Sequence, residues 1–491
     1  MTDENDRPSA AFEVRHRRTA RLPSSPAALE RLRQVPLVRV PSRFNVAVDL
    51  GNGLKAVYNT FSAALAVVPQ DLWQRFLAPG GRFSCAIDAV PRPLADLEGR
   101  GFFVAEGVDE LDLVRAHYNG GRHDRGRKIT ANILPTLGCN LSCSYCFEGQ
   151  LQVERHSRAM TRETEEAMVT FLAARVKGSR GLTVSWFGGE PLLSVAAIER
   201  LSPRLHKLCE DAEIPYGAVL TTNGVLLRED TVATLVRSRV SVLQVTVDVP
   251  NATKRDKKGR DTQETVLDNL VAAAAAAAVH LRINLTRDAP DEWDDLFDGL
   301  VRRGLHKTLK SVNIANVYQP EHARADGVRS DVAHRTYVDV VRRQRHRARA
   351  LGLPMHTSLS WQKPGGCAAT AETAFTIDPD GFLFKCPEDA GWPERAFGSV
   401  FVDGPTNQAN SLFWLTYDWF RHEQCRDCAV LPQCAGGCPH RRLFQPDLDR
   451  DDFCYWFLRG DLEGRILELA TSLMFGGADA DGSSAVEGCG T

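Results

Sequence analysis

The chain has 491 residues, of which 43% are apolar and 25% are charged, a composition typical of globular proteins. Its formal net charge of −2 argues against a protein that binds nucleic acid through a basic surface. No uncharged apolar run approaches the roughly 20 residues of a membrane span, and the polar start MTDENDRPSA lacks the apolar core of a secretory signal. We therefore expect a cytoplasmic protein with no membrane and no nucleic-acid partner, built from two or three domains.

The first part of the chain predicts an arm and a small folded unit. Residues 1–40 are rich in Arg, Pro and Ser and predict a largely flexible arm. FNVAVDLGNGLKAVYN, at 44–59, predicts a β-hairpin around its Gly-Asn-Gly turn. Helical spacing over 64–78 predicts a helix, and 94–118 predicts a helix, a short strand and a helix. We expect a small α+β adaptor domain, similar to a winged helix, over 41–125.

Strand and helix patterns alternate over 126–330. Thr161 predicts the N-cap of a helix over 161–178, and the Ala-rich stretch 264–280 predicts another helix. Buried strands separated by helices indicate a parallel sheet or barrel, and six units predict a partial (β/α)6 TIM-like barrel rather than a complete one of eight. The six expected strands are 129–136, 182–188, 216–224, 240–249, 281–286 and 311–317.

The remaining residues change character twice. Residues 331–365 are basic and predict a helical bridge. Residues 366–460 combine short strands, turns and seven cysteines, and 461–491 predict a helix followed by a disordered tail. The expected fold class is therefore α/β, with an N-terminal adaptor, a barrel and a C-terminal cysteine-rich domain.

Three cysteines follow the first barrel strand in LPTLGCNLSCSYCFEG: Cys139, Cys143 and Cys146. Clustered thiols in a reducing compartment indicate metal binding rather than disulfides. A four-iron, four-sulfur cube takes four thiolates, so three would leave one iron open at the end of the barrel where chemistry is placed. The alternatives are a zinc site, with His156 as a fourth ligand, and buried cysteines without a metal.

Polar, glycine-containing turns end the next two strands. WFGGEPLL places Glu190 after two glycines, where its carboxylate could accept a hydrogen bond from an ammonium group. LTTNGVLL ends the third strand with a second turn of this kind, at Asn223. Three such turns at consecutive strand ends indicate one shared site.

CNLSCSYCFE resembles the signature of the radical S-adenosylmethionine (radical SAM) enzymes, and GGEP resembles their motif for the methionine amine. The resemblance covers about 128–320. It implies that Cys139, Cys143 and Cys146 hold a [4Fe–4S] cluster whose open iron chelates SAM. It also implies that SAM is cleaved to a 5′-deoxyadenosyl radical, which abstracts a hydrogen atom from the substrate. The SAM pocket implied by the resemblance is lined by Gly188, Gly189, Glu190, Asn223, Asp248 and Asn284.

The seven downstream cysteines resemble the SPASM extension of radical SAM maturases, in CAATAETAFTIDPDGFLFKC, in CRDCAVLPQCAGGC and at Cys454. The resemblance implies two auxiliary [4Fe–4S] clusters. Three thiolates would hold the inner one, and its fourth ligand is not visible in the sequence. Two zinc ribbons are the alternative. The implied ligands are Cys367, Cys386 and Cys438 for the inner cluster, and Cys425, Cys428, Cys434 and Cys454 for the outer one.

The substrate is expected to be a precursor peptide or a protein. Anaerobic sulfatase-maturating enzymes share this layout, but they carry an acid where this chain has Pro387, followed by Glu388. Enzymes that form thioether or carbon–carbon crosslinks in ribosomally made peptides share it too, and residues 41–118 resemble their peptide-recognition element, which adds a leader peptide as a strand.

We therefore expect a radical SAM oxidoreductase that crosslinks a ribosomally synthesised peptide, with flavodoxin or ferredoxin as electron donor. The alternatives are a sulfatase-maturase-like enzyme or a small-molecule dehydrogenase or epimerase. A zinc-binding protein without catalytic activity is a more remote alternative. The sequence identifies no general base.

Overall fold

The computed structural model describes residues 34–86, 89–146, 148, 158–249, 254–285, 292–317, 334–356, 366–444 and 462–475. The predicted arm before residue 34, the predicted tail after residue 475, His156 and Cys454 lie outside these ranges. The chain forms two compact units, one of Met1–Ser42 with Asp71–Val108 and one of Arg43–Gln70 with Asp109–Thr491. No helix in the described ranges has the length and apolar character needed to cross a membrane.

The first unit contains a three-stranded antiparallel sheet in the order β5-β1-β6. The last residues of the stretch predicted as an arm form the start of strand β1. They are ordered because the backbone of β1 pairs with a strand on each side. The predicted helix and strand within 94–118 are present as α3 and β6. The elements of this unit are β1 (Leu37–Pro41), the π-helix η1 (Trp73–Leu77), β5 (Phe83–Cys85), α3 (Arg92–Gly99) and β6 (Phe103–Ala105).

The predicted hairpin forms β2 (Asn45–Gly51) and β3 (Leu54–Asn59), and the turn between them has positive φ at Asn52. The helix predicted over 64–78 is wrong in its first six residues, which form β4 (Ala64–Pro69) beside β3. Ala66 and Val68 alternate into the core there, so pairing with β3 overrides the helical spacing. Only the short α2 (Gln70–Leu72) and η1 are helical. Helix α19 (Leu462–Phe475) packs on this sheet.

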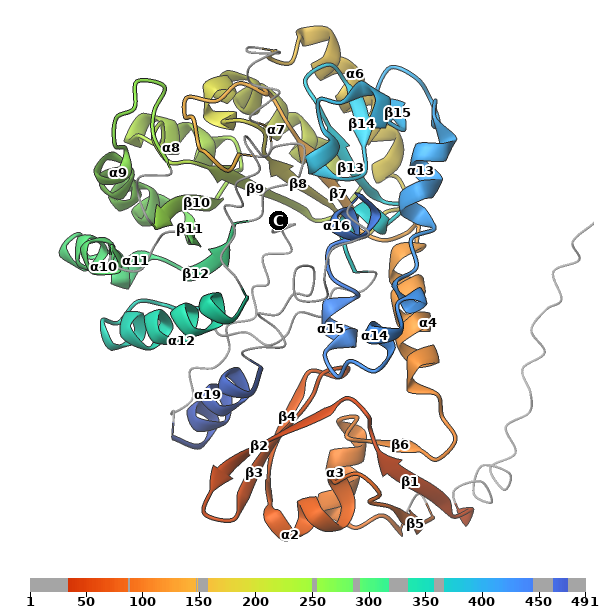
Figure 1. Cartoon of the computed structure of the whole chain (residues 1–491). Helices are drawn as coiled ribbons and strands as arrows, with labels where there is room; N and C mark the ends of the chain where they lie inside the picture. The colour runs from red at the N-terminus through yellow and green to blue at the C-terminus, as the bar shows by residue number, and fades with distance from the viewer. Residues whose placement is uncertain are drawn as a thin grey trace, which may run out of the picture. The chain divides into compact units, whose positions relative to one another are not determined.

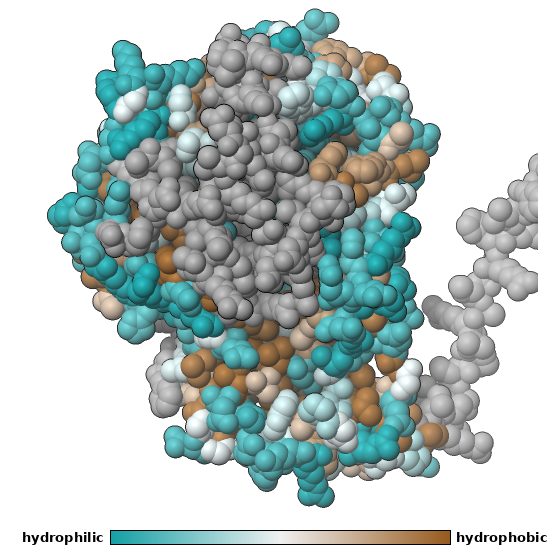
Figure 2. Space-filling view, viewed as in Figure 1, coloured by the Kyte–Doolittle hydropathy of each residue, from teal (hydrophilic) through white to brown (hydrophobic). Residues whose placement is uncertain are grey.

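The barrel of the second unit has six neighbouring parallel strands in the order β7 to β12, with helices along its outside (Figure 1). All six predicted strands are present, and the partial (β/α)6 TIM-like barrel is confirmed. The outward faces of α8–α10 are largely hydrophilic (Figure 2), as expected for helices that bury one face. The strands are β7 (Ile129–Ile133), β8 (Leu182–Trp186), β9 (Tyr216–Thr222), β10 (Val242–Val249), β11 (Ala278–Leu285) and β12 (Ser311–Asn316).

The barrel helices follow the sequence prediction with one correction. Thr161 caps α6, where its side chain accepts a hydrogen bond from the backbone N–H of Thr164. The helix predicted over 264–280 ends at Ala276, and its last three residues begin β11 because that strand pairs with both β10 and β12. The helices are α6 (Arg162–Val176), α7 (Val195–Asp211), α8 (Glu229–Arg237), α9 (Gln263–Ala276), α10 (Trp293–Arg302), α11 (Leu305–Thr308) and α12 (His334–Ala350).

A seventh parallel strand, which the sequence did not reveal, joins the barrel sheet from the cysteine-rich region. Strand β13 (Ala374–Ile377) pairs in parallel with β7, and β14 (Phe382–Phe384) and β15 (Gly398–Ser399) continue the sheet in antiparallel pairing. The first strand of the barrel is therefore clamped between β8 and a strand from more than 200 residues downstream.

The rest of the cysteine-rich region consists of short helices and turns. Helix α4 (Glu110–Arg122) lies beside it (Figure 1), and its Val114 and Tyr118 pack with Trp419 and Leu431. The short helices are η7 (Ala368–Thr370), η8 (Pro387–Asp389), η9 (Pro393–Arg395), α13 (Gln408–Leu415), η10 (Trp419–Arg421), α14 (Glu423–Arg426), α15 (Leu431–Cys434) and α16 (Pro439–Phe444).

Candidate functional site

The three cysteines of the first cluster lie on the loop that leaves the carboxyl end of β7. Burial raises the pKa of the Cys139 thiol to about 11 and that of Cys143 to about 12, and it raises the pKa of Cys146 well above its usual value. Each pKa is also raised by the charge of at least one neighbouring acid or cysteine. The loop thus gathers three largely buried thiols in one small space.

Within the described ranges, no three His, Cys, Asp or Glu side chains converge closely enough to hold one metal ion. A cubane cluster places each thiolate on a separate iron, so its ligands do not have to meet at one point. The three thiols on one loop fit that arrangement.

Gly188 and Gly189 let the chain after β8 lie directly against the cysteine loop. A Cβ atom on Gly188 would lie 2.4 Å from the carbonyl oxygen of Thr136, and one on Gly189 would lie 2.3 Å from that of Gly138. Gly188 also has a φ of +120°, which side chains rarely tolerate. The space beside both glycines is therefore filled by backbone of the cysteine loop, a structural role that the sequence did not suggest.

Glu190 is fully buried and connects the ends of β8 and β9. Its carboxylate accepts hydrogen bonds from Thr222 Oγ1 at 2.7 Å, the Asn223 backbone N–H at 2.8 Å and the Leu192 backbone N–H at 3.0 Å. Burial raises the pKa of Glu190, and these hydrogen bonds oppose the rise. The carboxylate is thus held rigidly beside the cysteine loop.

Asn223 contacts that loop through its side chain. Its Nδ2 donates to Asn140 Oδ1 at 2.8 Å, and its Oδ1 accepts from the backbone N–H of Val225 at 3.0 Å. Asn140 directly follows Cys139 in the sequence. The turn after β8 is also bonded to the cysteine loop, because the backbone N–H of Glu190 donates to the carbonyl oxygen of Gly138 at 2.8 Å.

Asp248 and Asn284 face each other because β10 and β11 pair in the register Asp248↔Asn284. Tyr145 reaches them from the cysteine loop: its hydroxyl donates to the Asp248 carboxylate, with distances of 2.8 and 2.7 Å to the two oxygens. Asn284 Nδ2 donates to the same hydroxyl at 3.1 Å, and Arg282 Nε donates to Asn284 Oδ1 at 2.9 Å. The loop is thereby anchored to two further strands.

The sequence did not assign a role to Tyr145, although its position beside the third cysteine was a visible signal. It also gave no indication of Lys254, which lies in a polar, charged stretch. The Lys254 side chain is buried and donates to the backbone carbonyls of Asn223 and Thr246. Its charge lowers the pKa of Cys139 and Cys143 and of Glu190, so a cation lies among these groups.

Glu148 follows the third cysteine by two residues and is also buried. Neither of its carboxylate oxygens has a hydrogen-bond partner in the described part of the chain, and burial raises its pKa to about 8. An orphaned buried carboxyl beside the thiols of Cys139 and Cys146 indicates that the site accommodates a further polar group.

The second group of cysteines lies among the short helices. Cys367 and Cys386 pack in one apolar cluster with Trp414, and the charge of Cys438 raises the pKa of Cys386, although burial is the main cause of that rise. Three other cysteines, Cys425, Cys428 and Cys434, lie on α14, α15 and the turn between them.

Buried charged side chains accompany these cysteines. His440 Nδ1 lies 3.2 Å from Glu388 Oε2, and His440 Nε2 lies 3.5 Å from Asp389 Oδ1. Arg395 lies 3.0 Å from Asp389, and Arg442 Nη2 lies 3.1 Å from the sulfur of Cys425. The sequence singled out Glu388 but none of its partners.

Comparisons with known proteins agree with this geometry. Residues 133–300 match the family described as the Radical SAM superfamily. The radical SAM cyclopropyl synthase TigE of Paramaledivibacter caminithermalis is 21% identical over 373 residues, which are 69% of this chain and 74% of TigE. A serine-type anaerobic sulfatase-maturating enzyme of Klebsiella aerogenes is 23% identical over 326 residues, 61% of this chain and 77% of that enzyme.

A solved structure of native anSMEcpe with bound AdoMet and Cp18Cys peptide shares the fold. It matches with a TM-score of 0.53 at 17% identity, over 70% of this chain and 99% of that one. This chain therefore contains a radical SAM domain over residues 133–300 and is a radical SAM enzyme related to a radical SAM cyclopropyl synthase and to anaerobic sulfatase-maturating enzymes. The family implies a [4Fe–4S] cluster and SAM.

Proposed function

Because residues 133–300 form a radical SAM domain, we propose that this enzyme abstracts a hydrogen atom from a ribosomally synthesised peptide and so forms a crosslink, such as a thioether or a carbon–carbon bond. The observation that carries the proposal is the meeting of the cysteine loop with the ends of β8 to β11, through Glu190, Asn223 and the contacts of Tyr145. Its relationship to sulfatase-maturating enzymes, whose names give a protein as the substrate, supports a peptide or protein substrate.

In this proposal Cys139, Cys143 and Cys146 hold the [4Fe–4S] cluster. The bound cluster and SAM supply a one-electron cleavage that yields a 5′-deoxyadenosyl radical. The Glu190 carboxylate binds the methionine amine together with the Gly188–Gly189 backbone. Asp248 and Asn284, already fixed by Tyr145, line the remainder of the SAM pocket with Asn223.

Lys254 completes the charge balance of this pocket. Its ammonium group is buried beside Glu190 and Asn223 and has no hydrogen bond to a carboxylate in the described ranges. The Glu190 carboxylate is one counter-charge for this buried cation, and the carboxylate of bound SAM would supply a second. We therefore assign Lys254 to the SAM carboxylate.

For the second region we propose two auxiliary [4Fe–4S] clusters in a SPASM-type domain. Cys367, Cys386 and Cys438 would hold the inner cluster, and Cys425, Cys428, Cys434 and Cys454 the outer one. Support comes from the packing of Cys367 with Cys386 and from the influence of Cys438 on Cys386. The proposed setting is the cytoplasm, with flavodoxin or ferredoxin as electron donor and residues 41–118 as a leader-peptide recognition element.

A sulfatase-maturase-like oxidation of a protein side chain is the second candidate. Glu388 and Asp389 are buried next to Cys386 and share His440, so an acid–imidazole group lies beside the second cysteine cluster. Sulfatase-maturating enzymes are also among the relatives of this chain.

The test uses the full chain, reconstituted without oxygen with iron and sulfide. Three clusters would give about twelve irons per chain. With SAM and dithionite, the enzyme should release 5′-deoxyadenosine and lower the mass of a precursor peptide, encoded beside its gene, by about 2 Da per crosslink formed by loss of two hydrogens. A mass change on a sulfatase-derived peptide alone would favour the second candidate, and stoichiometric zinc without iron would contradict both.

A further inference from the structure

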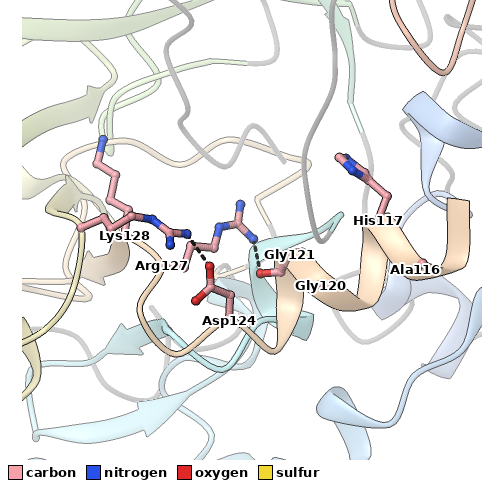
Figure 3. Close-up of a pocket in the computed structure, with 8 residues that line it drawn as sticks. Ala116, His117, Gly120, Gly121, Asp124, Arg127 and Lys128 are labelled. Atoms are coloured by element: carbon pink, nitrogen blue, oxygen red, sulfur yellow. Dashed lines mark hydrogen bonds and ion pairs between the residues drawn. The ribbon is translucent and has the colours of Figure 1, made fainter. Parts of the chain in front are cut away.

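A basic pocket lies in the second unit between the end of α4, the loop that follows it and the turn before β8 (Figure 3). It has a volume of about 480 Å³, and we define it by His117, Gly121, Asp124, Arg127, Lys128 and Arg180. The pocket borders the start of β7 and β8, whereas the candidate SAM site lies at their carboxyl ends. It is therefore separate from that site.

Positive charge exceeds negative charge in this pocket. Asp124 forms an ion pair with Arg180, and Arg127 Nη1 donates to the carbonyl oxygen of Gly121 at 3.0 Å. Lys128 has no ion-pair partner in the described part of the chain. A local excess of cations on a chain with a net charge of −2 creates a field that attracts an acidic partner.

The last turn of α4 leaves the pocket uncovered. Gly120 and Gly121 occupy consecutive helical positions, although glycine destabilises a helix relative to alanine. A Cβ atom on Gly120 would meet no other atom within 4 Å. Arg180 keeps 65% of its side chain exposed, so the pocket opens to solvent rather than enclosing a small ligand.

The same helix connects the pocket to the second cysteine region. Tyr118, next to His117 of the pocket, is buried, and its ring packs edge-on against Trp419 at 5.1 Å between centroids. Its hydroxyl lies 3.2 Å from Thr370 Oγ1, which donates to the carbonyl oxygen of Cys367 at 2.8 Å. A partner docked on the pocket would thus lie two side chains away from the backbone of Cys367.

We propose that the basic pocket is the docking site of an acidic one-electron carrier protein that exchanges electrons with the second cysteine region. This inference rests on the proposed function, in which Cys367 holds an auxiliary cluster. One electron passes between the two proteins without transfer of an atom, so that one is oxidised as the other is reduced. Charge complementarity supplies orientation and a fast encounter.

The test compares Lys128→Glu with the charge-neutralising double variant Arg127→Gln/Lys128→Gln, both in the reconstituted full chain. The matched control, Arg204→Glu/Lys207→Glu, reverses two exposed charges on α7. The probe is an acidic flavodoxin, and the measurements are its Kd at low and high salt and zero-length crosslinking to Lys128. Dithionite-driven formation of 5′-deoxyadenosine is measured in parallel.

We expect Lys128→Glu to raise the Kd about tenfold at low salt and much less at high salt, because salt screens exposed charges. The double variant removes the same two units of positive charge and should weaken binding by a similar factor, and the control should bind like the wild type. Flavodoxin binding unchanged in both pocket variants would overturn the proposal, as would pyrophosphate binding at the pocket without flavodoxin binding. If the proposed function is wrong, the wild type itself will form no 5′-deoxyadenosine with dithionite. The docking variants should not change that dithionite-driven reaction.

Discussion

The two cysteine regions of this protein are built in different ways. The first cysteine loop lies on a barrel whose strands and hydrogen bonds hold it on several sides, through contacts such as those of Tyr145 and Glu190. In the described part of the second region, Cys425, Cys428 and Cys434 lie on short helices and a turn, and polar anchors such as Arg442 reach the thiols themselves. We infer that the barrel orders its site without metal, whereas the second region depends on its clusters for order.

The largest expected effect separates catalysis from folding in the first region. Cys143→Ala should abolish 5′-deoxyadenosine formation and remove about four irons per chain, while thermal stability changes little. The reason is that the loop keeps its other hydrogen bonds to the strand ends. Iron content, product formation and a melting curve measure the three effects.

The matched control for that variant is Cys209→Ala. Cys209 is buried in α7, away from every predicted cluster, so this variant should keep its iron and its activity and lose only some stability. Equal iron loss in both variants would show that the first loop has no special role.

A cysteine variant in the second region should disturb the local structure more than Cys143→Ala does in the first region. Cys425→Ala should raise amide exchange within 366–444 by about tenfold or more, since the short helices there lose the cluster that orders them. Hydrogen exchange with mass spectrometry measures this. Unchanged protection in 366–444, together with a lost cluster, would end the proposed contrast between the two regions.

Tyr145→Phe tests the anchoring of the first loop. It removes a hydrogen bond to the buried Asp248 carboxylate, worth about 1.5–3 kcal/mol, so SAM affinity should fall about tenfold or more. Calorimetric titration of the reconstituted enzyme with SAM measures this. Tyr216→Phe removes the hydrogen bond between the hydroxyls of Tyr216 on β9 and Ser202 on α7. It is the control and should bind SAM normally.

Asp378 gives a pH-dependent test of the strand pair that clamps β7. Burial raises its pKa from 3.8 to about 7, against hydrogen bonds from the backbone N–H groups of Phe382 and Asp380. Between these values the folded state keeps a proton that the unfolded chain has lost, so stability should fall as pH rises from about 4 to 7. Asp378→Asn should remove this fall.

Melting temperatures from pH 4 to 8 measure that effect. The control Asp380→Asn changes a more exposed carboxylate on the same turn. It should keep most of the wild-type pH dependence, because burial of Asp378, and not the charge of Asp380, is the main cause of the raised pKa. Parallel pH curves for the wild type and Asp378→Asn would contradict the assignment.

The smallest expected effect is a loss of stability from a change in a barrel helix that lies outside the candidate site. Thr161→Ala removes the N-cap of α6 and should lower stability by about 1 kcal/mol, with no change in iron content. Thr161→Ser keeps the hydroxyl and should restore most of the loss. A change in iron content with Thr161→Ala would indicate that the barrel helices and the cysteine loop are less independent than we infer.

Local patterns made much of the barrel predictable. The six strands alternate with helices, and the motifs at 139–146, 188–190 and 223 fall at strand ends, where parallel topology brings them together. Asp248 and Asn284 become neighbours through the β10–β11 register, which is consistent with their common assignment.

Other features depend on contacts that local patterns do not encode. Strand β13 joins β7 from a distant segment, β4 forms where the spacing predicted a helix, and Lys254 lies in a stretch whose charges suggest a solvated surface. In each case tertiary pairing or burial decided the outcome, and single-sequence periodicity carries no information about either.

The most direct test of the central claim is the magnetic coupling between the reduced cluster of the barrel loop and SAM. The enzyme would be reconstituted, reduced with dithionite and mixed with SAM that carries nitrogen-15 in its amine. We predict a changed electron paramagnetic resonance spectrum with a resolved nitrogen-15 coupling, which disappears in Cys143→Ala. A fully loaded enzyme whose spectrum is unaffected by SAM would contradict the account.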